Sequence, residues 1–376
     1  MLSPRILYVA YPLLTVSNES AGGAEQVLWT LEREMARRGL QTAVAASAGS
    51  RVSGELLSTG DPCTRPDDYD RRNREHQDKI VALVRQHDRE GRGFDLIHDM
   101  SGSFWTRAAE VDAPVLATLH LPRSFYPPKS FQDVPGKVAF NCVSSSQSRT
   151  FGDLRTLLGV VANGIALDGL AHDSGADAAR YGERRGLLWL GRICEEKAPH
   201  LALEVAARAG LAITLAGQVY PFSYHQQYFE REVAPRLREM PPAKFISSPS
   251  FASKRRLLRE AQALLGTSLA DETSSLVAME AAAAGMPVIA FGRGALPELI
   301  QDQVTGFLVD DVEEAAAACG RLDAIHSAIC AQHARDNFSA VKMADGYRHL
   351  YSRILQQNIP QQNIPQQKTD LTAAGD

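Results

Sequence analysis

The chain has 376 residues, enough for two domains of ordinary size, of which 44% are hydrophobic and 22% charged. The formal net charge of −4 is small, which argues against nucleic acid as a partner selected by overall charge. No stretch of the sequence reaches the roughly 20 apolar residues that a membrane-spanning helix needs. Composition therefore predicts a globular protein with sizeable cores.

The cysteines are odd in number and widely spaced, and no two form a Cys-x-x-Cys pair. They are Cys63, Cys142, Cys194, Cys319 and Cys330. This pattern argues against a disulfide framework and against a zinc site, and it favours reduced, buried thiols. The first ten residues lack the apolar core and cleavage site of a signal peptide. We therefore expect a cytoplasmic protein, and peripheral membrane contact stays open.

Strand-length apolar runs alternate with helical patterns in the first half of the chain. The expected strands are 6–11, 42–46, 95–98, 115–120 and 138–143. Apolar residues at helical spacing over 27–35, ended by Gly39, predict the first helix, and Ile80, Leu83 and Val84 mark another. This alternation predicts an α/β domain with a parallel sheet.

A second series follows a crossing near Asn163 and Gly164. Its expected strands are 186–190, 212–216, 244–247, 263–266, 287–291 and 306–309, and its expected helices are 201–209, 224–240, 254–262, 275–284 and 312–322. The predicted domains are 1–165 and 166–338, followed by a helix over 339–356. The polar repeat in 357–376 cannot bury enough surface to order itself, which predicts a flexible tail.

Ligands of open α/β sheets bind where strands end and helices begin. Gly22 and Gly23 occupy such a place, at the start of the first expected helix. Paired glycines allow close backbone approach, and free N–H groups favour an anion such as a diphosphate. An ordinary tight turn would have the same sequence, so both interpretations stay open.

Two cations follow the first strand of the second domain. Arg192 and Lys197 precede a helix that Pro199 opens. Cations beside a helix N-terminus suit a diphosphate, because Arg can bind two oxygens at once. The alternative is a solvated loop whose charges are balanced by Glu195 and Glu196.

Two carboxylates lie at the start of the helix expected over 275–284. Glu272 precedes it, and Glu280 lies on it, with seven residues between them. Glu272 could accept hydrogen bonds from sugar hydroxyls, Glu280 could bind both hydroxyls of a ribose, and the amides of Ser274, Ser275 and Leu276 could meet a phosphate. Ser and Glu also suit helix initiation, which is the alternative.

In this order and spacing, the three clusters resemble family 4 of the retaining glycosyltransferases, over nearly the whole chain to about residue 350. The matching motifs are Gly22-Gly23-Ala24-Glu25, Gly191-Arg192 with Lys197, Glu272 with Glu280, Gly-x-Pro-Val at 285–288, Pro297-Glu298, and 305–309. The resemblance implies the GT-B fold: two Rossmann-like α/β/α domains facing each other across a cleft, the helix 339–356 packing back on the first.

The resemblance also implies roles. Arg192 and Lys197 would neutralise the donor diphosphate in place of a divalent metal. Glu280 would hold the ribose, and Glu272 the hydroxyls of the transferred sugar. His120 matches a family histidine near the sugar, although a lone histidine is more often structural. The implied activity is transfer with retention from a nucleotide sugar, most readily a UDP- or GDP-sugar, without cofactor or metal, to a glycan, lipid-linked or small-molecule hydroxyl.

Four departures from the family pattern point to altered substrate preference. Thr273-Ser274-Ser275 replaces the usual Pro-Phe-Gly, Leu-Pro follows His120 where Asp is frequent, Ala198 replaces a glycine, and Ala166 an Asp. The acceptor is expected on the first domain, near 51–74 and 122–136. The sequence does not specify donor base, donor sugar, acceptor, linkage or oligomeric state.

Three alternatives were weighed. Asp68-Tyr69-Asp70 spells the Asp-x-Asp of metal-dependent transferases, but no apolar strand leads into it, which favours a solvated loop. Nucleotide-sugar epimerases share the two-domain architecture, and fold does not decide function. An inactive sugar-nucleotide-binding subunit would keep the same motifs.

Overall fold

The first domain is built on one parallel sheet, as the alternation of strand and helix patterns predicts. The computed structural model describes residues 3–127, 129–168, 170, 184–240 and 242–357. The first sheet has the order β3-β2-β1-β4-β5-β6-β7. Its strands are β1 (Arg5–Val9), β2 (Gln41–Ala46), β3 (Glu55–Ser58), β4 (Leu96–Asp99), β5 (Val115–Leu119), β6 (Val138–Cys142) and β7 (Leu157–Val160). Its α-helices are α1 (Gly23–Arg37), α2 (Tyr69–Arg89) and α3 (Ser145–Thr150).

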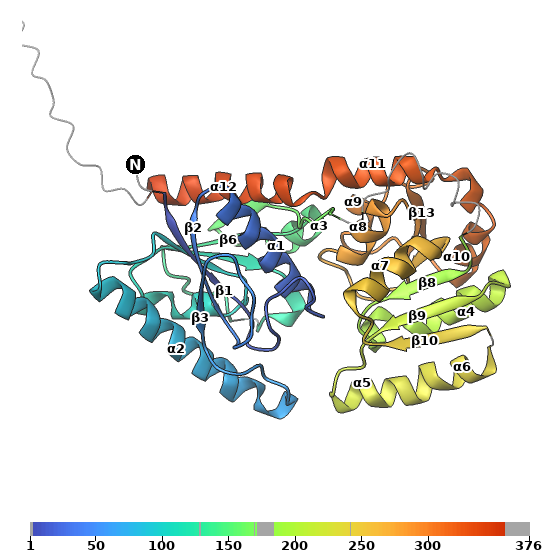
Figure 1. The fold of residues 1–376 in the computed structure, drawn as a ribbon, viewed down its shortest axis with the longest axis horizontal. Coiled ribbons are helices and arrows are strands. Elements are labelled where there is room, and N and C mark those ends of the chain that lie inside the picture. Colours follow the sequence, from blue (N-terminus) through green and yellow to red (C-terminus); the bar gives the residue numbers. More distant parts are fainter. Residues whose placement is uncertain (1–2, 128, 169, 171–183, 241, 358–376) are drawn as a thin grey trace, which may run out of the picture.

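The second domain repeats the design, with the sheet order β10-β9-β8-β11-β12-β13. Its strands are β8 (Leu187–Leu190), β9 (Ile213–Gly217), β10 (Ala243–Ser247), β11 (Ala263–Gly266), β12 (Val288–Phe291) and β13 (Gly306–Val309). Its α-helices are α4 (Pro199–Ala209), α5 (Ser223–Tyr228), α6 (Ala234–Glu239), α7 (Phe251–Glu260), α8 (Leu276–Ala283), α9 (Leu296–Leu299), α10 (Val312–Cys319) and α11 (Ser327–Asn337). Figure 1 shows the two lobes side by side.

Both sheets are buried on both faces, which explains their continuous apolar strands. In β1, Leu7 and Val9 join one core cluster while Ile6 and Tyr8 join the other. β8 divides in the same way, with Leu188 in one cluster and Trp189 in the other. Alternate side chains of a strand point to opposite faces, so each sheet separates two cores.

The chain crosses between the domains twice, and the two crossings touch. The amide of Ile165 donates to the carbonyl of Phe338 at 2.8 Å, and the amide of Ala340 donates to the carbonyl of Ile165 at 3.0 Å. A Cβ on Gly164 would lie 2.6 Å from the Ser339 carbonyl oxygen, so only glycine fits there.

The return crossing leads into α12 (Ala340–Gln357), which lies along the first domain in Figure 1. Tyr347 and Tyr351 of this helix are buried in a first-domain core cluster. The ring of His98 lies 2.7 Å from the Tyr351 hydroxyl. The second crossing therefore carries the last helix back onto the domain that the chain left.

One local expectation was confirmed with an irregularity, and another was wrong. The segment expected as a helix over 224–240 is helical from Ser223 to Glu239, with a π-helical stretch, Phe229–Val233, between α5 and α6. Pro235 has no N–H to donate to the preceding turn, which accounts for the irregularity. The stretch 68–70 is not a loop, because α2 begins at Tyr69 and Arg71 bonds Asp68 at 3.1 Å.

Five short elements were not expected: β3, β7, α3, α9 and α11. The tail predicted beyond Gln357 lies outside the described residues, as does most of the stretch 168–184 at the start of the second domain. Within the described ranges, no helix combines the length and apolar character needed to cross a membrane.

Candidate functional site between the two domains

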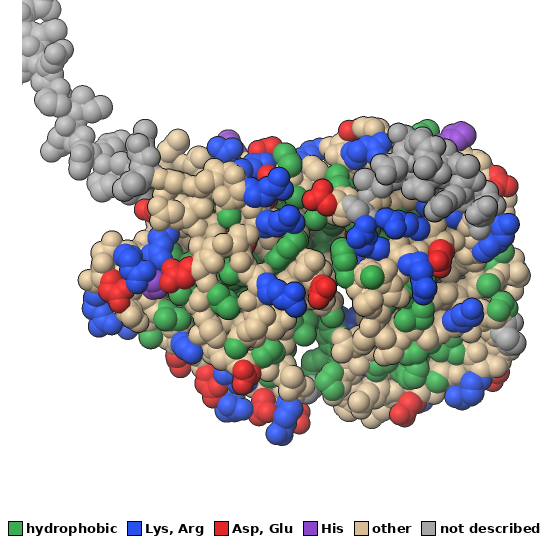
Figure 2. Space-filling view, in the orientation of Figure 1, with side chains coloured by type: hydrophobic (Ala, Val, Ile, Leu, Met, Phe, Trp, Pro, Cys, Tyr) green, Lys and Arg blue, Asp and Glu red, His purple; other side chains and the backbone are tan. Residues whose placement is uncertain are grey.

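A cavity of about 870 Å³ lies between the two domains. The hollow between the lobes is visible in Figure 2. Its second-domain wall includes the loops that follow β8 and β11, the neighbouring strands at which that sheet reverses its order. Such a switch point is where open α/β sheets bind ligands.

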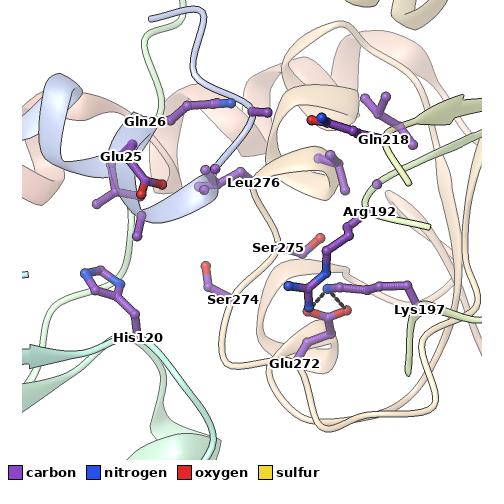
Figure 3. A pocket seen from close by; sticks show the side chains of 18 of the residues that line it. Glu25, Gln26, His120, Arg192, Lys197, Gln218, Glu272, Ser274, Ser275 and Leu276 are labelled. Atoms are coloured by element: carbon purple, nitrogen blue, oxygen red, sulfur yellow. Dashed lines mark hydrogen bonds and ion pairs between the residues drawn. The ribbon is translucent and has the colours of Figure 1, made fainter. Parts of the chain in front are cut away.

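All ten site residues predicted from the sequence line this one cavity. They are Gly22, Gly23, His120, Arg192, Lys197, Glu272, Ser274, Ser275, Leu276 and Glu280. Figure 3 shows His120 on the first-domain side, and Arg192, Lys197 and Glu272 on the second-domain side. Residues separated by up to 258 positions are therefore brought to one site by the fold alone.

The loop after β8 presents Arg192 and Lys197 to the cavity. The Arg192 guanidinium lies 5.7 Å from the centre of the Tyr220 ring. Lys197 Nζ forms an ion pair with Glu272, at 2.6 Å from Oε2. Ala198 then adopts a left-handed backbone conformation with φ of 44°. This conformation costs a non-glycine residue about 1–2 kcal/mol, which explains why the family usually has glycine at this position.

Glu280 is held by a lysine that the sequence motifs did not reveal. Lys254 of α7 donates to Glu280 Oε1 at 2.6 Å, and both side chains are nearly buried. Lys254 stands in a run of three basic residues on an otherwise unremarkable helix. Nothing in its local pattern separates it from its neighbours, so only the tertiary structure identifies it.

Helix α8 begins at the cavity. Its N-cap is Ser275, whose side chain accepts from the amide of Ala278. A Cβ on Gly23 would lie 3.6 Å from Leu276, so the starts of α1 and α8 face each other across the cavity. Thr273, one of the departures from the family pattern, donates its hydroxyl to the His120 carbonyl at 2.7 Å. That bond joins the two domains beside the cavity.

Two titratable groups of the first-domain wall have pKa values that burial shifts away from their usual ranges. Burial lowers the pKa of His120 to about 4, so its ring is neutral near pH 7. Burial raises the pKa of Glu25 to about 7. A Cβ on Gly22 would overlap the Glu25 carboxylate at 1.9 Å, so glycine is required for this carboxylate to lie where it does. The sequence motif included Glu25, but its protonation was not predicted.

Five buried polar atoms of the cavity wall have no hydrogen-bond partner. They are Tyr11 Oη, His120 Nε2, Asn163 Oδ1, Ser274 Oγ and Glu280 Oε2. Buried polar atoms are nearly always hydrogen-bonded in native proteins. A cluster of unpaired donors and acceptors in one cavity therefore marks a binding site for a polar ligand.

Two Rossmann-like domains that face each other across such a cavity define the GT-B glycosyltransferase fold, as expected from the sequence. Residues 184–324 match the family of group 1 glycosyl transferases.

The curated relatives that match this chain are named as glycosyltransferases. The D-inositol 3-phosphate glycosyltransferase of Mycolicibacterium smegmatis is 30% identical over 213 residues, which cover 54% of this chain and 48% of the relative. The enzyme of the same name from Mycobacterium marinum is 31% identical over 192 residues, covering 46% and 39%. The matched part of the chain thus spans less than half the length of these relatives.

Solved structures agree over nearly the whole chain. Sucrose-phosphate synthase of Thermosynechococcus elongatus superimposes with a TM-score of 0.73 at 18% identity, over 94% of this chain and 100% of that one. HepE of Anabaena in complex with UDP-glucose gives 0.70 at 16% identity, over 93% and 100%. At such identities the likeness establishes the fold.

Proposed function

We propose that the protein is a metal-independent, retaining family 4 glycosyltransferase that moves a sugar from a nucleoside diphosphate sugar to a hydroxyl of an acceptor. The observation that carries this proposal is the set of unpaired polar atoms in the inter-domain cavity, together with two cations on one loop. A nucleotide sugar offers ribose and sugar hydroxyls as partners for the unpaired atoms, and diphosphate oxygens as partners for the two cations.

The donor is proposed to bind mainly to the second domain. Arg192 and Lys197 would bind the diphosphate, aided by the amides at the start of α8. Glu280 would accept from the ribose with its free oxygen Oε2, while Lys254 holds Oε1 in place. Glu272 would accept from hydroxyls of the transferred sugar.

We expect a UDP- or GDP-sugar as donor. HepE, which shares the fold, was solved with UDP-glucose, and starch synthase IV of Arabidopsis thaliana was solved with ADP. Structures of this fold thus bind different nucleotide bases, and the screen described below identifies the base of the donor.

The acceptor is proposed to be uncharged where it meets the first domain. Of the described residues that line the cavity from this domain, none is Lys or Arg, and several are aromatic, including Tyr11, Tyr69 and Phe125. Arg123 is the nearest basic residue in sequence to Phe125, but it pairs with Asp153 at 3.0 Å and stacks on Phe151. Aromatic rings and unpaired polar atoms suit a neutral sugar or other neutral alcohol.

A thermal-shift screen with UDP-, GDP- and ADP-sugars tests the donor. Ligand at 100 times its Kd stabilises the folded state by about 2.7 kcal/mol. The sugar that binds is then incubated with neutral acceptors and with their phosphorylated counterparts, and products are identified by NMR. Epimerised donor in the absence of acceptor would replace the proposal by an epimerase. Binding without turnover of any acceptor would favour a binding subunit.

A further inference from the structure

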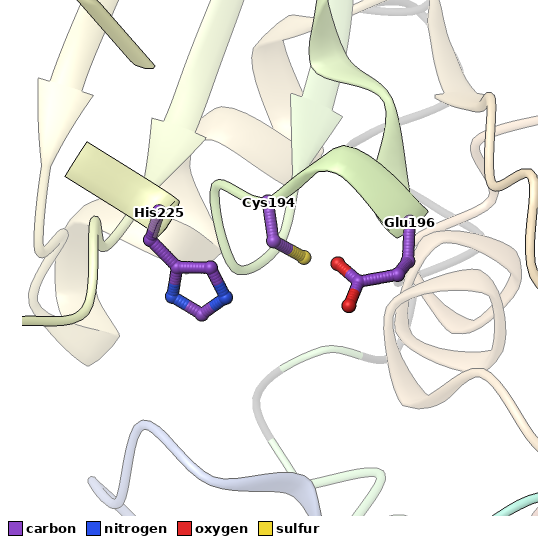
Figure 4. A group of neighbouring side chains, drawn as sticks. All are labelled: Cys194, Glu196 and His225. Atoms are coloured by element: carbon purple, nitrogen blue, oxygen red, sulfur yellow. The ribbon is translucent and has the colours of Figure 1, made fainter. Parts of the chain in front are cut away.

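A group of three potential metal ligands lies close to Arg192, and the proposed transfer does not use it. Cys194 follows β8, Glu196 lies in the 3-10 helix Glu195–Lys197, and His225 lies on α5. One ligand atom of each lies within 4.8 Å of the others. None of the three lines the inter-domain cavity. In Figure 4 the Cys194 sulfur and the Glu196 carboxylate face each other beside the His225 ring.

The polar atoms of this group lack partners of their own. Both ring nitrogens of His225 are buried without a hydrogen bond, and the residue is only 1% exposed. Glu196 Oε2 is also buried and unpaired. The Cys194 thiol lies 3.6 Å from the Arg192 carbonyl oxygen and also interacts with the Glu196 carboxylate of the same group. An imidazole buried with neither nitrogen bonded is rare in native proteins, and a bound ion would supply the missing interaction.

We propose that Cys194, Glu196 and His225 bind a zinc ion, with water as the fourth ligand. A thiolate, an imidazole and a carboxylate are the donor groups that Zn²⁺ accepts in proteins, usually in tetrahedral geometry. Zinc–ligand bonds of about 2.0–2.3 Å place tetrahedral ligand atoms roughly 3.3–3.6 Å apart. The ligand atoms lie up to 4.8 Å apart, so side-chain rotations that move them by roughly 1 Å would bring them to the separations that zinc requires.

The charges of the group suit a divalent cation. Zinc binding displaces the thiol proton to solvent, and the resulting thiolate and the Glu196 carboxylate together balance the ion. An imidazole binds zinc in its neutral form, so His225 would add no charge of its own. The positive charge of Arg192 opposes the ion, so the two negative ligands are both needed.

Bound zinc would join two loops of the second domain. Cys194 and Glu196 lie on the segment that carries Arg192 and Lys197, and His225 lies on the helix that follows Tyr220. The ion would therefore fix the proposed phosphate-binding segment from outside the cavity without touching the donor. This zinc site is structural, and it does not depend on which reaction the protein catalyses.

The test measures zinc binding to the full-length protein directly. Metal is removed with a chelator, and ZnCl₂ is titrated in competition with a chromophoric chelator. We expect one tight site per chain, and a loss of more than about 100-fold in affinity in Cys194→Ala and in His225→Gln, since loss of even an outer-shell partner costs 10–100-fold. Cobalt(II) should give a thiolate charge-transfer absorption that Cys194→Ala abolishes.

Matched controls come from the same domain. Cys319 is a buried free thiol, and His326 is an exposed histidine. Cys319→Ala and His326→Gln should keep the affinity of the unchanged protein. Circular dichroism establishes that each variant is folded. Equal zinc affinity in all four variants, or no tight site in the folded wild-type protein, would overturn the assignment. A folding failure of Cys194→Ala leaves His225→Gln and the cobalt spectrum of the unchanged protein to decide.

Discussion

Lys197 Nζ lies 2.6 Å from Glu272 Oε2, in an ion pair between residues 75 positions apart in the chain. The lysine is proposed to bind the donor diphosphate and the glutamate to bind the donor sugar. Their side chains are 34% and 12% exposed, so the pair is reachable from the cavity. Donor binding would replace this ion pair with contacts from each residue to the donor.

Substituting the cations should impair turnover while leaving the fold intact. We expect Arg192→Ala and Lys197→Ala each to lower kcat/KM by about 100-fold or more, because removing one donor aimed at developing charge costs about 2.7–4 kcal/mol. Arg208→Ala is a control, since Arg208 is an exposed residue of the same domain paired with Glu313. Steady-state kinetics with the identified donor checks this. Unchanged kcat/KM in both cavity variants would refute the phosphate assignment.

The two glutamates should have separable effects. Glu280→Gln is expected to weaken binding of the free nucleoside diphosphate, because the ribose belongs to that product. Glu272→Gln should leave this binding nearly intact and impair donor turnover. Lys254→Gln should resemble Glu280→Gln, because Lys254 holds the Glu280 carboxylate at 2.6 Å. Isothermal titration calorimetry with the free nucleotide measures all three, and equal losses for Glu272→Gln and Glu280→Gln would contradict the assignment.

Turnover should not depend on Mg²⁺ or Mn²⁺, because Arg192 and Lys197 supply the positive charge that a metal provides elsewhere. We expect the rate to be the same with EDTA and with added Mg²⁺. Loss of turnover in EDTA that either ion restores would mean that a metal binds the diphosphate. A slow loss that only Zn²⁺ restores would instead point to the site at Cys194.

Glu25 should make the stability of the protein depend on pH. Burial raises its pKa from 4.5 to about 7. Between these values the folded protein keeps a proton that the unfolded chain has lost, so stability falls as pH rises from about 4.5 to 7 and stays lower above. The difference corresponds to about 3 kcal/mol. A glutamine side chain cannot ionise, so Glu25→Gln should remove this pH dependence of stability.

Urea unfolding of the wild type and of Glu25→Gln at pH 5 and pH 8 tests this prediction. The free energy of unfolding of Glu25→Gln minus that of the wild type should be larger at pH 8 than at pH 5. Glu204→Gln is a control, because Glu204 is a partly exposed carboxylate of the second domain. A stability difference between wild type and Glu25→Gln that does not change with pH would show that Glu25 is ionised normally.

Much of this architecture follows from the sequence, because parallel sheets buried on both faces have continuous apolar strands that are easy to recognise. β11 was expected at its observed bounds, Ala263–Gly266. The edge strands β3 and β7 were missed because they are short and partly exposed. Pro235 carried the signal for the π-helical stretch between α5 and α6, since a proline cannot donate the backbone hydrogen bond of a regular α-helix.

The site residues, too, could be predicted from the sequence only in part. Residues within one motif could be predicted, because their spacing alone places them on one loop or one helix turn. The contacts Lys254–Glu280 and Thr273–His120 could not, because each joins segments that meet only in the folded chain. The group around Cys194 shows this most clearly, because Cys194 and Glu196 meet His225 of α5 only in the folded chain.

The last prediction concerns the stereochemistry of transfer. The resemblance to the retaining family 4 transferases implies attack on the face from which the leaving group departs. We therefore expect the acceptor hydroxyl to attack from the side that the diphosphate leaves. The bond between the anomeric carbon and the diphosphate oxygen breaks, and the bond to the acceptor oxygen forms on the same face. A diphosphate oxygen takes the acceptor proton, while Arg192 and Lys197 stabilise the departing charge.

An α-linked donor should then yield an α-glycoside, which proton NMR of the first product shows through its anomeric coupling. His120→Ala should impair transfer far more than nucleotide binding, because His120, with its unpaired Nε2, lines the cavity from the first domain and the nucleotide is proposed to bind to the second. His326→Gln, an exposed histidine of the second domain, is the control. A β-linked product from an α-linked donor would overturn the retaining mechanism even if every donor contact were correct, because inversion requires attack from the face opposite the leaving diphosphate.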